Sequence, residues 1–92
     1  MSKIKLNEPI VDLEGNEGEE VGKFVRSALL SNSEKDNTDQ KIKKYKLAMD
    51  CVADEVDLRA EDIALIKECV GKQFPPLVVG RVFDAIDPED NG

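Results

Sequence analysis

The segment Ala60–Ile86, AEDIALIKECVGKQFPPLVVGRVFDAI, carries the clearest structural pattern in this chain. Apolar residues recur in it at spacings of three and four, first before and then after a pair of prolines. The first set is Ile63, Leu65, Ile66, Cys69 and Val70, and the second is Val79, Val82, Phe83 and Ile86. This period is typical of helices with one apolar face. The stretch therefore predicts two helices.

The residues between the two sets predict a short, stiff turn. Gly71 is placed to take a positive φ at the end of the first helix, where glycine carries no steric penalty. Pro75 and Pro76 prevent simple continuation of that helix and suit the first turn of the next. We therefore expect Ala60–Ile86 to fold as an αα-hairpin.

Two more helices are expected upstream of the hairpin. The first begins near Glu19, with Glu19 and Glu20 in its first turn, where the helix dipole favours negative charge. Its apolar stripe is Val21, Phe24, Val25, Ala28 and Leu29. The second begins after Asn37 or Thr38, with Gln40 placed to complete a capping box with Asn37. Its apolar face is Ile42, Tyr45, Met49 and Val52, with Ala48 allowing close approach and an end near Ala53.

Short extended pieces surround these helices. Lys3–Leu13 alternates weakly, and residues 14–18 read as a turn because they contain two glycines and an asparagine. A second extended piece is expected at Glu55–Leu58. Both pieces contain Val-Asp-Leu and both are too short to be stable alone, so we expect them to pair with one another.

The chain is expected to be mainly α: a small four-helix domain with a C-terminal αα-hairpin and one or two very short β-strands. At 92 residues it is long enough for one modest core and too short for two. Within this single domain, 1–92, we expect an extended arm and loop at 1–18, a helical core at 19–86 and a flexible tail at 87–92.

Charge and hydropathy exclude several classes of protein. Charged residues make up 36% of the chain and the net charge is −7, which opposes direct binding of nucleic acid. The first residues carry no secretory signal, and no apolar run approaches the length of a membrane span. A cytoplasmic location without membrane contact is expected.

The chain lacks the usual residues of catalytic and metal sites. It has no histidine, so the commonest general acid–base and metal-binding side chain is absent. Cys51 and Cys69 lie among apolar neighbours and acids, and are therefore expected to be core residues rather than a disulfide or a nucleophile. Neither a calcium loop nor a phosphate-binding loop has its required spacing. We expect no enzyme, no metal and no cofactor.

Two surface features point to partners. Residues 74–80 are almost all apolar or proline, which is more apolar surface than one helix face needs. They form either a tightly packed turn or a surface that docks another protein. That other protein can be a second copy of the chain, so a homodimer stays open. The docking residues assigned on this basis are Phe74, Pro75, Pro76, Leu77, Val78 and Phe83. A lysine cluster is either a solvated helix face, the favoured interpretation, or a polyanion contact. Its members are Lys41, Lys43, Lys44 and Lys46.

Two segments, LNEPIVDLEG at 6–15 and DLRAEDIALIKECVGKQFPPLVVGRVFDAI at 57–86, resemble a group of small acidic proteins of tailed bacteriophages and prophages of Gram-negative bacteria. The resemblance implies the cytoplasm of the bacterial host and a role near virion morphogenesis, and it transfers no catalytic residue. We therefore expect a non-enzymatic accessory or chaperone in head or tail assembly that binds a phage or host protein. The alternative is an acidic inhibitor of a host nucleic-acid enzyme or defence complex, acting through Glu14–Glu20 and Asp84–Asp90.

Overall fold

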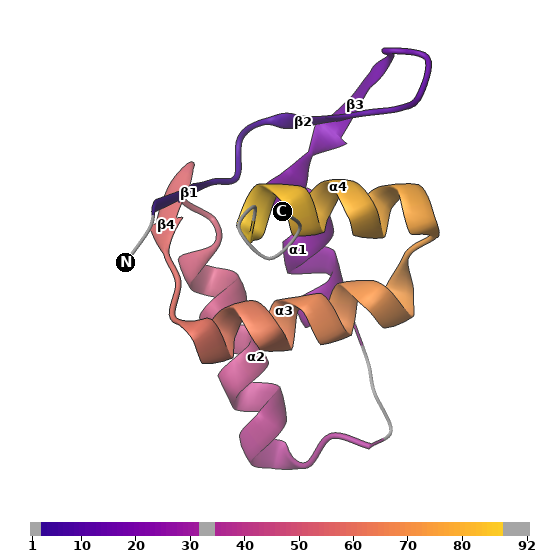
Figure 1. Ribbon diagram of the computed structural model, residues 1–92. Coiled ribbons are helices and arrows are strands. Elements are labelled where there is room, and N and C mark those ends of the chain that lie inside the picture. Colours follow the sequence, from indigo (N-terminus) through magenta and orange to yellow (C-terminus); the bar gives the residue numbers. More distant parts are fainter. Residues whose placement is uncertain (1–2, 32–34, 88–92) are drawn as a thin grey trace.

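The computed structural model describes residues 3–31 and 35–87 and is mostly helical (Figure 1). Its helices are α1 (Val21–Leu29), α2 (Thr38–Asp50), α3 (Ala60–Gln73) and α4 (Pro76–Ile86). Its strands are β1 (Lys3–Lys5), β2 (Pro9–Val11), β3 (Glu17–Glu20) and β4 (Glu55–Asp57). The mainly α prediction with four helices is confirmed, while the described part of the chain has four short strands rather than one or two. Most of the expected tail, residues 88–92, lies outside the described residues.

The four strands form two separate antiparallel pairs. β1 pairs with β4, with Ile4 opposite Val56, so the predicted pairing of the N-terminal piece with Glu55–Leu58 is confirmed. The shared Val-Asp-Leu was the wrong reason for it. The first copy of that tripeptide begins in β2, which pairs with β3 instead. The true pairing follows from Ile4, which is buried in the core.

The start of α1 differs from the prediction. Glu19 and Glu20 belong to β3, with Glu20 opposite Pro9, and the first turn of the helix contains no acid. The Val21 N–H donates to the Glu8 carbonyl at 2.9 Å, and the Gly22 N–H donates to the Leu6 carbonyl at the same distance. The segment before the helix therefore satisfies the first N–H groups of α1, which needs no acidic side chains there.

The predicted capping box of α2 is confirmed. The Gln40 N–H donates to Asn37 Oδ1 at 2.8 Å, and the Asn37 N–H donates to Gln40 Oε1 at 3.0 Å. This reciprocal pair satisfies two N–H groups that would otherwise have no partner. Helix α2 therefore begins where the sequence places it.

The end of α3 lies two residues beyond the predicted position. Gly71 is inside the helix, and among the described glycines only Gly15, in the turn before β3, has a positive φ. The helix ends instead at Gln73, because the next residue, Phe74, is extended where it precedes a proline. Pro76 then occupies the first position of α4. Figure 1 shows α4 returning alongside α3.

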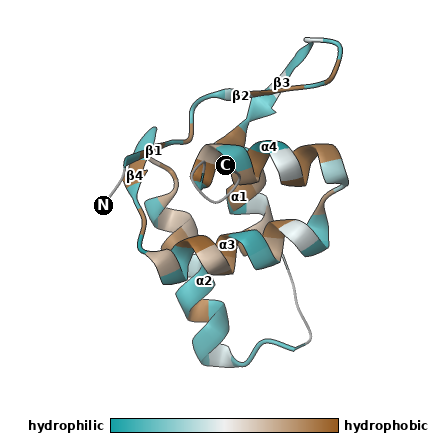
Figure 2. Ribbon diagram, viewed as in Figure 1, coloured by the Kyte–Doolittle hydropathy of each residue, from teal (hydrophilic) through white to brown (hydrophobic). Residues whose placement is uncertain are grey.

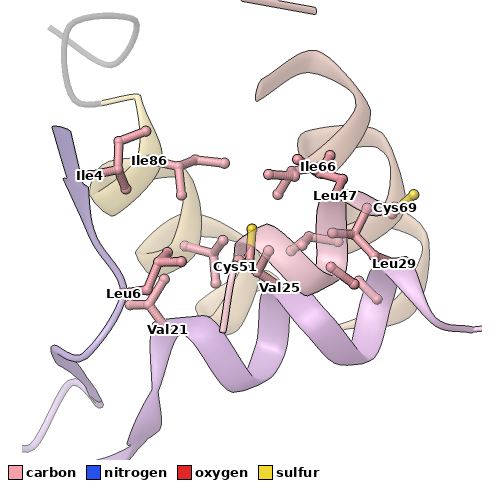
Figure 3. Close-up of a cluster of buried hydrophobic side chains, with 14 of the residues drawn as sticks. Ile4, Leu6, Val21, Val25, Leu29, Leu47, Cys51, Ile66, Cys69 and Ile86 are labelled. Atoms are coloured by element: carbon pink, nitrogen blue, oxygen red, sulfur yellow. The ribbon is translucent and has the colours of Figure 1, made fainter. Parts of the chain in front are cut away.

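The core lies where β1, α1, α3 and α4 meet, and α2 closes one side (Figure 3). The fully or nearly fully buried side chains in it include Leu6, Val25, Leu29, Cys51, Ile66, Val70, Val82 and Ile86. Most of the predicted stripe of α1 is buried, and Phe24 is partly buried at its edge.

The prediction that the apolar face of α2 is buried in the core is wrong. Ile42, Tyr45, Met49 and Val52 are between 48% and 64% exposed. The helix instead buries Leu47 and Ala48, together with Cys51 at its end. α1 is the main helix contact of α2, and Arg26 of α1 donates to the Cys51 carbonyl, so the side of α2 that carries Leu47, Ala48 and Cys51 is turned inward.

Candidate protein interaction surfaces

The predicted docking residues are divided between the core edge and the surface. The rings of Phe74 and Phe24 pack edge to face, with centroids 5.2 Å apart and an interplanar angle of 82°. Phe83 is partly buried, and the Lys67 ammonium lies 5.2 Å from its ring centroid. Val78 also packs against the core. These three side chains already contact other parts of the domain.

The exposed remainder of this predicted surface is small. Pro75, Pro76 and Leu77 are exposed at the start of α4, with Leu77 37% exposed. They form a single apolar corner where α3 is joined to α4. Any docking surface here must therefore be centred on Leu77.

Two substitutions at this corner distinguish an exposed residue, Leu77, from a residue at the edge of the core, Val78. Leu77→Asp is expected to change the free energy of unfolding by no more than about 0.5 kcal/mol, because the side chain is exposed and an acid near a helix N-terminus is favourable. Val78→Asp, which places a charge at the core edge, is expected to cost more than about 1 kcal/mol. Urea unfolding followed by circular dichroism measures both. Equal destabilisation by the two variants would contradict this division.

The four predicted lysines do not form one surface. Lys41, Lys43 and Lys46 are exposed, whereas the Lys44 ammonium is largely covered and hydrogen-bonds the Asp36 carboxylate. That hydrogen bond raises the pKa of Lys44. Lys44 therefore joins α2 to the segment before it, and only three lysines remain available to a partner.

The exposed apolar side chains of α2 form the most continuous candidate surface. We call Ile42, Tyr45 and Met49 of α2, together with Val52 in the turn that follows Asp50, the α2 stripe. Leu30, exposed at the end of α1, borders it where a pocket of about 220 Å³ lies between Leu30 and Tyr45. Figure 2 shows α2 as a mainly hydrophilic helix, so these apolar side chains are set among polar neighbours. Sequence periodicity found the stripe but assigned it to the core.

A second surface, which sequence reasoning missed, is a groove of about 980 Å³ between β1, β2 and the C-terminal half of α4. Ile10, Leu58 and Ile63 supply apolar lining, while Arg59 and Asp84 add charges of both signs. At its wall Arg81 Nε donates to the Val11 carbonyl at 2.8 Å, which ties α4 to β2. No pattern within a few residues predicts this groove, because its walls come from segments that are far apart in the described chain.

The thiols occupy the core as predicted. Cys51 and Cys69 are both free and buried. Burial raises the pKa of Cys51 to about 11, with a further increase from Asp50 and an opposing effect from Arg26. Burial also raises the pKa of Cys69, against the opposing effect of Lys44. Both side chains are thus held as neutral thiols, the form that is a poor nucleophile.

The part of the chain that the structure describes has neither a metal-binding cluster nor a membrane-spanning helix. Residues 3–31 and 35–87 contain no group of three or more Cys, Asp or Glu side chains arranged to hold a metal ion. No helix among them is long and apolar enough to cross a bilayer. Comparisons with protein-family models, curated proteins and solved structures find no match for this chain.

Proposed function

We propose that this protein is a non-enzymatic interaction module that binds another protein through the α2 stripe. The single observation that supports the proposal is the exposure of three large apolar side chains along α2, and of Val52 in the turn after it, on a chain that is 36% charged. Contiguous exposed apolar surface is uncommon on small soluble domains and marks interaction sites. Burying such side chains against a partner removes apolar area from water and so favours association.

The remainder of the fold acts as a scaffold in this proposal. We propose that α3 and α4 form an αα-hairpin against which α1 packs, since α1 contacts both helices. The Arg26 guanidinium donates to the Cys51 carbonyl at 2.8 Å and so joins α1 to the end of α2. The α2 stripe is therefore presented from a packed support rather than from an isolated helix.

The proposed setting is the cytoplasm of a bacterial host, where the protein acts as an accessory or chaperone in phage head or tail assembly. Support for this setting comes from the resemblance of residues 6–15 and 57–86 to small acidic proteins of tailed phages. An assembly factor needs a surface that associates and is released without chemistry, which suits an apolar stripe flanked by charges.

Affinity capture from phage-infected bacteria tests this function. We expect the wild-type protein to retain a capsid or tail protein, and Met49→Asp to lose it, because a charge would enter the centre of the α2 stripe. Leu13→Asp is the matched control, since it adds the same charge at a leucine that is 87% exposed and lies outside both the α2 stripe and the predicted docking residues. Binding through apolar contacts should survive added salt. Capture that is unchanged by Met49→Asp would contradict the proposal.

A second candidate function is an acidic inhibitor of a host nucleic-acid enzyme or defence complex. The observation that favours it is the β2–β3 ribbon, which projects from the helical body and exposes Glu14, Glu17, Glu19 and Glu20 (Figure 1). A basic partner held by this ribbon should be released steeply as salt is raised, because exposed charges are screened. Capture of a polymerase or nuclease with that salt dependence would favour the inhibitor over the assembly factor.

A further inference from the structure

We infer that the edge of β1 that faces away from β4, which we call the β1 edge, binds an extended acidic segment of a partner protein as an added strand. The inference goes beyond the proposed function, because neither β1 nor the groove beside it belongs to the α2 stripe. Three features carry it: the backbone groups of the β1 edge, the position of the groove and the charges along this edge.

The backbone of β1 offers hydrogen-bonding groups on the side away from β4. The Leu6 N–H donates to the Asp54 carbonyl at 2.7 Å, so it points to the β4 side. Backbone groups of alternate residues in an antiparallel strand point to the same side, so those of Ile4 also point to β4. The N–H and C=O groups of Lys3 and Lys5 therefore point to the β1 edge. Within residues 3–31 and 35–87 this sheet has two strands only, and such an edge is a template for a further strand.

The groove described above lies along β1 on the side that β4 does not occupy. All three residues of β1 line it, whereas none of the three residues of β4 does. Residues directly opposite one another on paired strands point their side chains to the same face of the sheet. Figure 3 shows the Ile4 side chain beside Ile86, and both residues line the groove. A partner residue opposite Ile4 would therefore place its side chain in the groove, whose apolar lining favours an apolar residue there.

The charges along the β1 edge select acidic residues on either side of that apolar residue. β4, which reads Glu-Val-Asp, places its acids opposite Lys5 and Lys3 and its valine opposite Ile4. A strand on the β1 edge meets the same three side chains, and opposite charges across a sheet attract. The lining of the groove contains four basic and three acidic side chains, although the chain has a net charge of −7. Lysines also discourage a basic strand from pairing at this edge, which adds specificity.

Antiparallel addition makes the fullest use of these groups. The partner residues opposite Lys3 and Lys5 each exchange two backbone hydrogen bonds with the lysine, while the residue between them turns its own backbone groups away from β1. Main-chain hydrogen bonds then supply affinity, and the groove and the lysines supply specificity. The ligand is thus an extended segment with the pattern acidic, apolar, acidic.

A capped synthetic peptide in which glutamate and valine alternate tests the inference on the full chain. In nuclear magnetic resonance spectra of isotope-labelled protein, we expect saturable shifts of the Lys5 and Ala85 amides and slower hydrogen exchange at the Lys5 amide. Lys5→Glu should weaken binding at least tenfold, because like charges then face one another. Lys35→Glu is the matched control, since it makes the same charge change at an exposed lysine outside the groove and should bind like the wild type. A wild-type chain without saturable shifts at β1 overturns the inference.

Methylation of the peptide backbone tests strand addition without any change to the protein. Methylated glutamate nitrogens lose the donors that face β1, so this peptide should not bind. Methylated valine nitrogens lose donors that face away from β1, so that peptide should bind within about threefold of the unmodified one. Equal binding by the two methylated peptides means that side chains alone hold the peptide, which also overturns the inference. Met49→Asp should bind the unmodified peptide like the wild type, so this site and the proposed function of the α2 stripe fail or hold separately.

Discussion

Replacing Ile66 with alanine is expected to lower the free energy of unfolding by about 2–5 kcal/mol, the usual cost of removing a large aliphatic side chain from a packed core. Ile66 is 0% exposed and lies on α3 within the buried cluster (Figure 3). The substitution removes apolar contacts and leaves a cavity that neighbouring helices fill only in part. Since small domains are stable by roughly 5–15 kcal/mol, we expect a large fall in the urea midpoint, measured by circular dichroism.

Ile42→Ala is the matched control, because it makes the same chemical change on another helix. Ile42 belongs to the exposed α2 stripe, so the expected change in the free energy of unfolding is within about 0.5 kcal/mol. A cost for Ile42→Ala equal to that for Ile66→Ala would show that Ile42 is a core residue, as its periodicity first indicated.

Local patterns predicted much of the fold. The capping box of Asn37 and Gln40 located the start of α2 because its hydrogen bonds depend only on residues three apart. The Pro75–Pro76 pair likewise placed the junction of the last two helices, since proline restricts the residue before it and suits the start of a helix. Such signals are encoded within a few residues and need no knowledge of the tertiary structure.

Periodicity could not decide which side of α2 is buried. The helix has two apolar arcs, a large one containing Tyr45 and Met49 and a smaller one containing Leu47, Ala48 and Cys51. Hydropathy favours the larger arc, but in the structure α2 packs on α1 and buries the arc that carries Leu47 and Ala48. The choice depends on which side of α2 meets a neighbouring helix, which no single-helix pattern contains.

The candidate surfaces were predicted only in part for the same reason. Residues 74–80 are unusually apolar. Phe74, however, packs against Phe24, fifty residues away in the chain, and is therefore partly buried. The groove beside α4 depends on Arg81 meeting Val11, a contact across seventy residues. Long-range contacts decide which apolar residues remain exposed, and these contacts are not visible in sequence spacing.

Raising the pH from about 8 to 10.5 is expected to remove roughly 2 kcal/mol of stability through Cys51 alone. Burial raises the pKa of this thiol from 9.0 to about 11 in the folded protein. Folding therefore favours the neutral thiol, and this stabilisation is complete below pH 9 and is lost as the pH rises through 9 toward 11. The loss follows because the unfolded chain releases the proton first.

The measurement compares urea unfolding of the wild type and Cys51→Ala, in reducing buffer, at several pH values across this range. Cys51→Ala carries a constant packing cost at every pH, because the removed sulfur leaves a cavity in the core. The difference in the free energy of unfolding between the two proteins should therefore shrink as pH rises, by roughly 2 kcal/mol. Cys69→Ala serves as a second comparison, since burial raises the pKa of that thiol as well. A difference that stays constant with pH would mean that water reaches Cys51 and that α2 does not seal this side of the core.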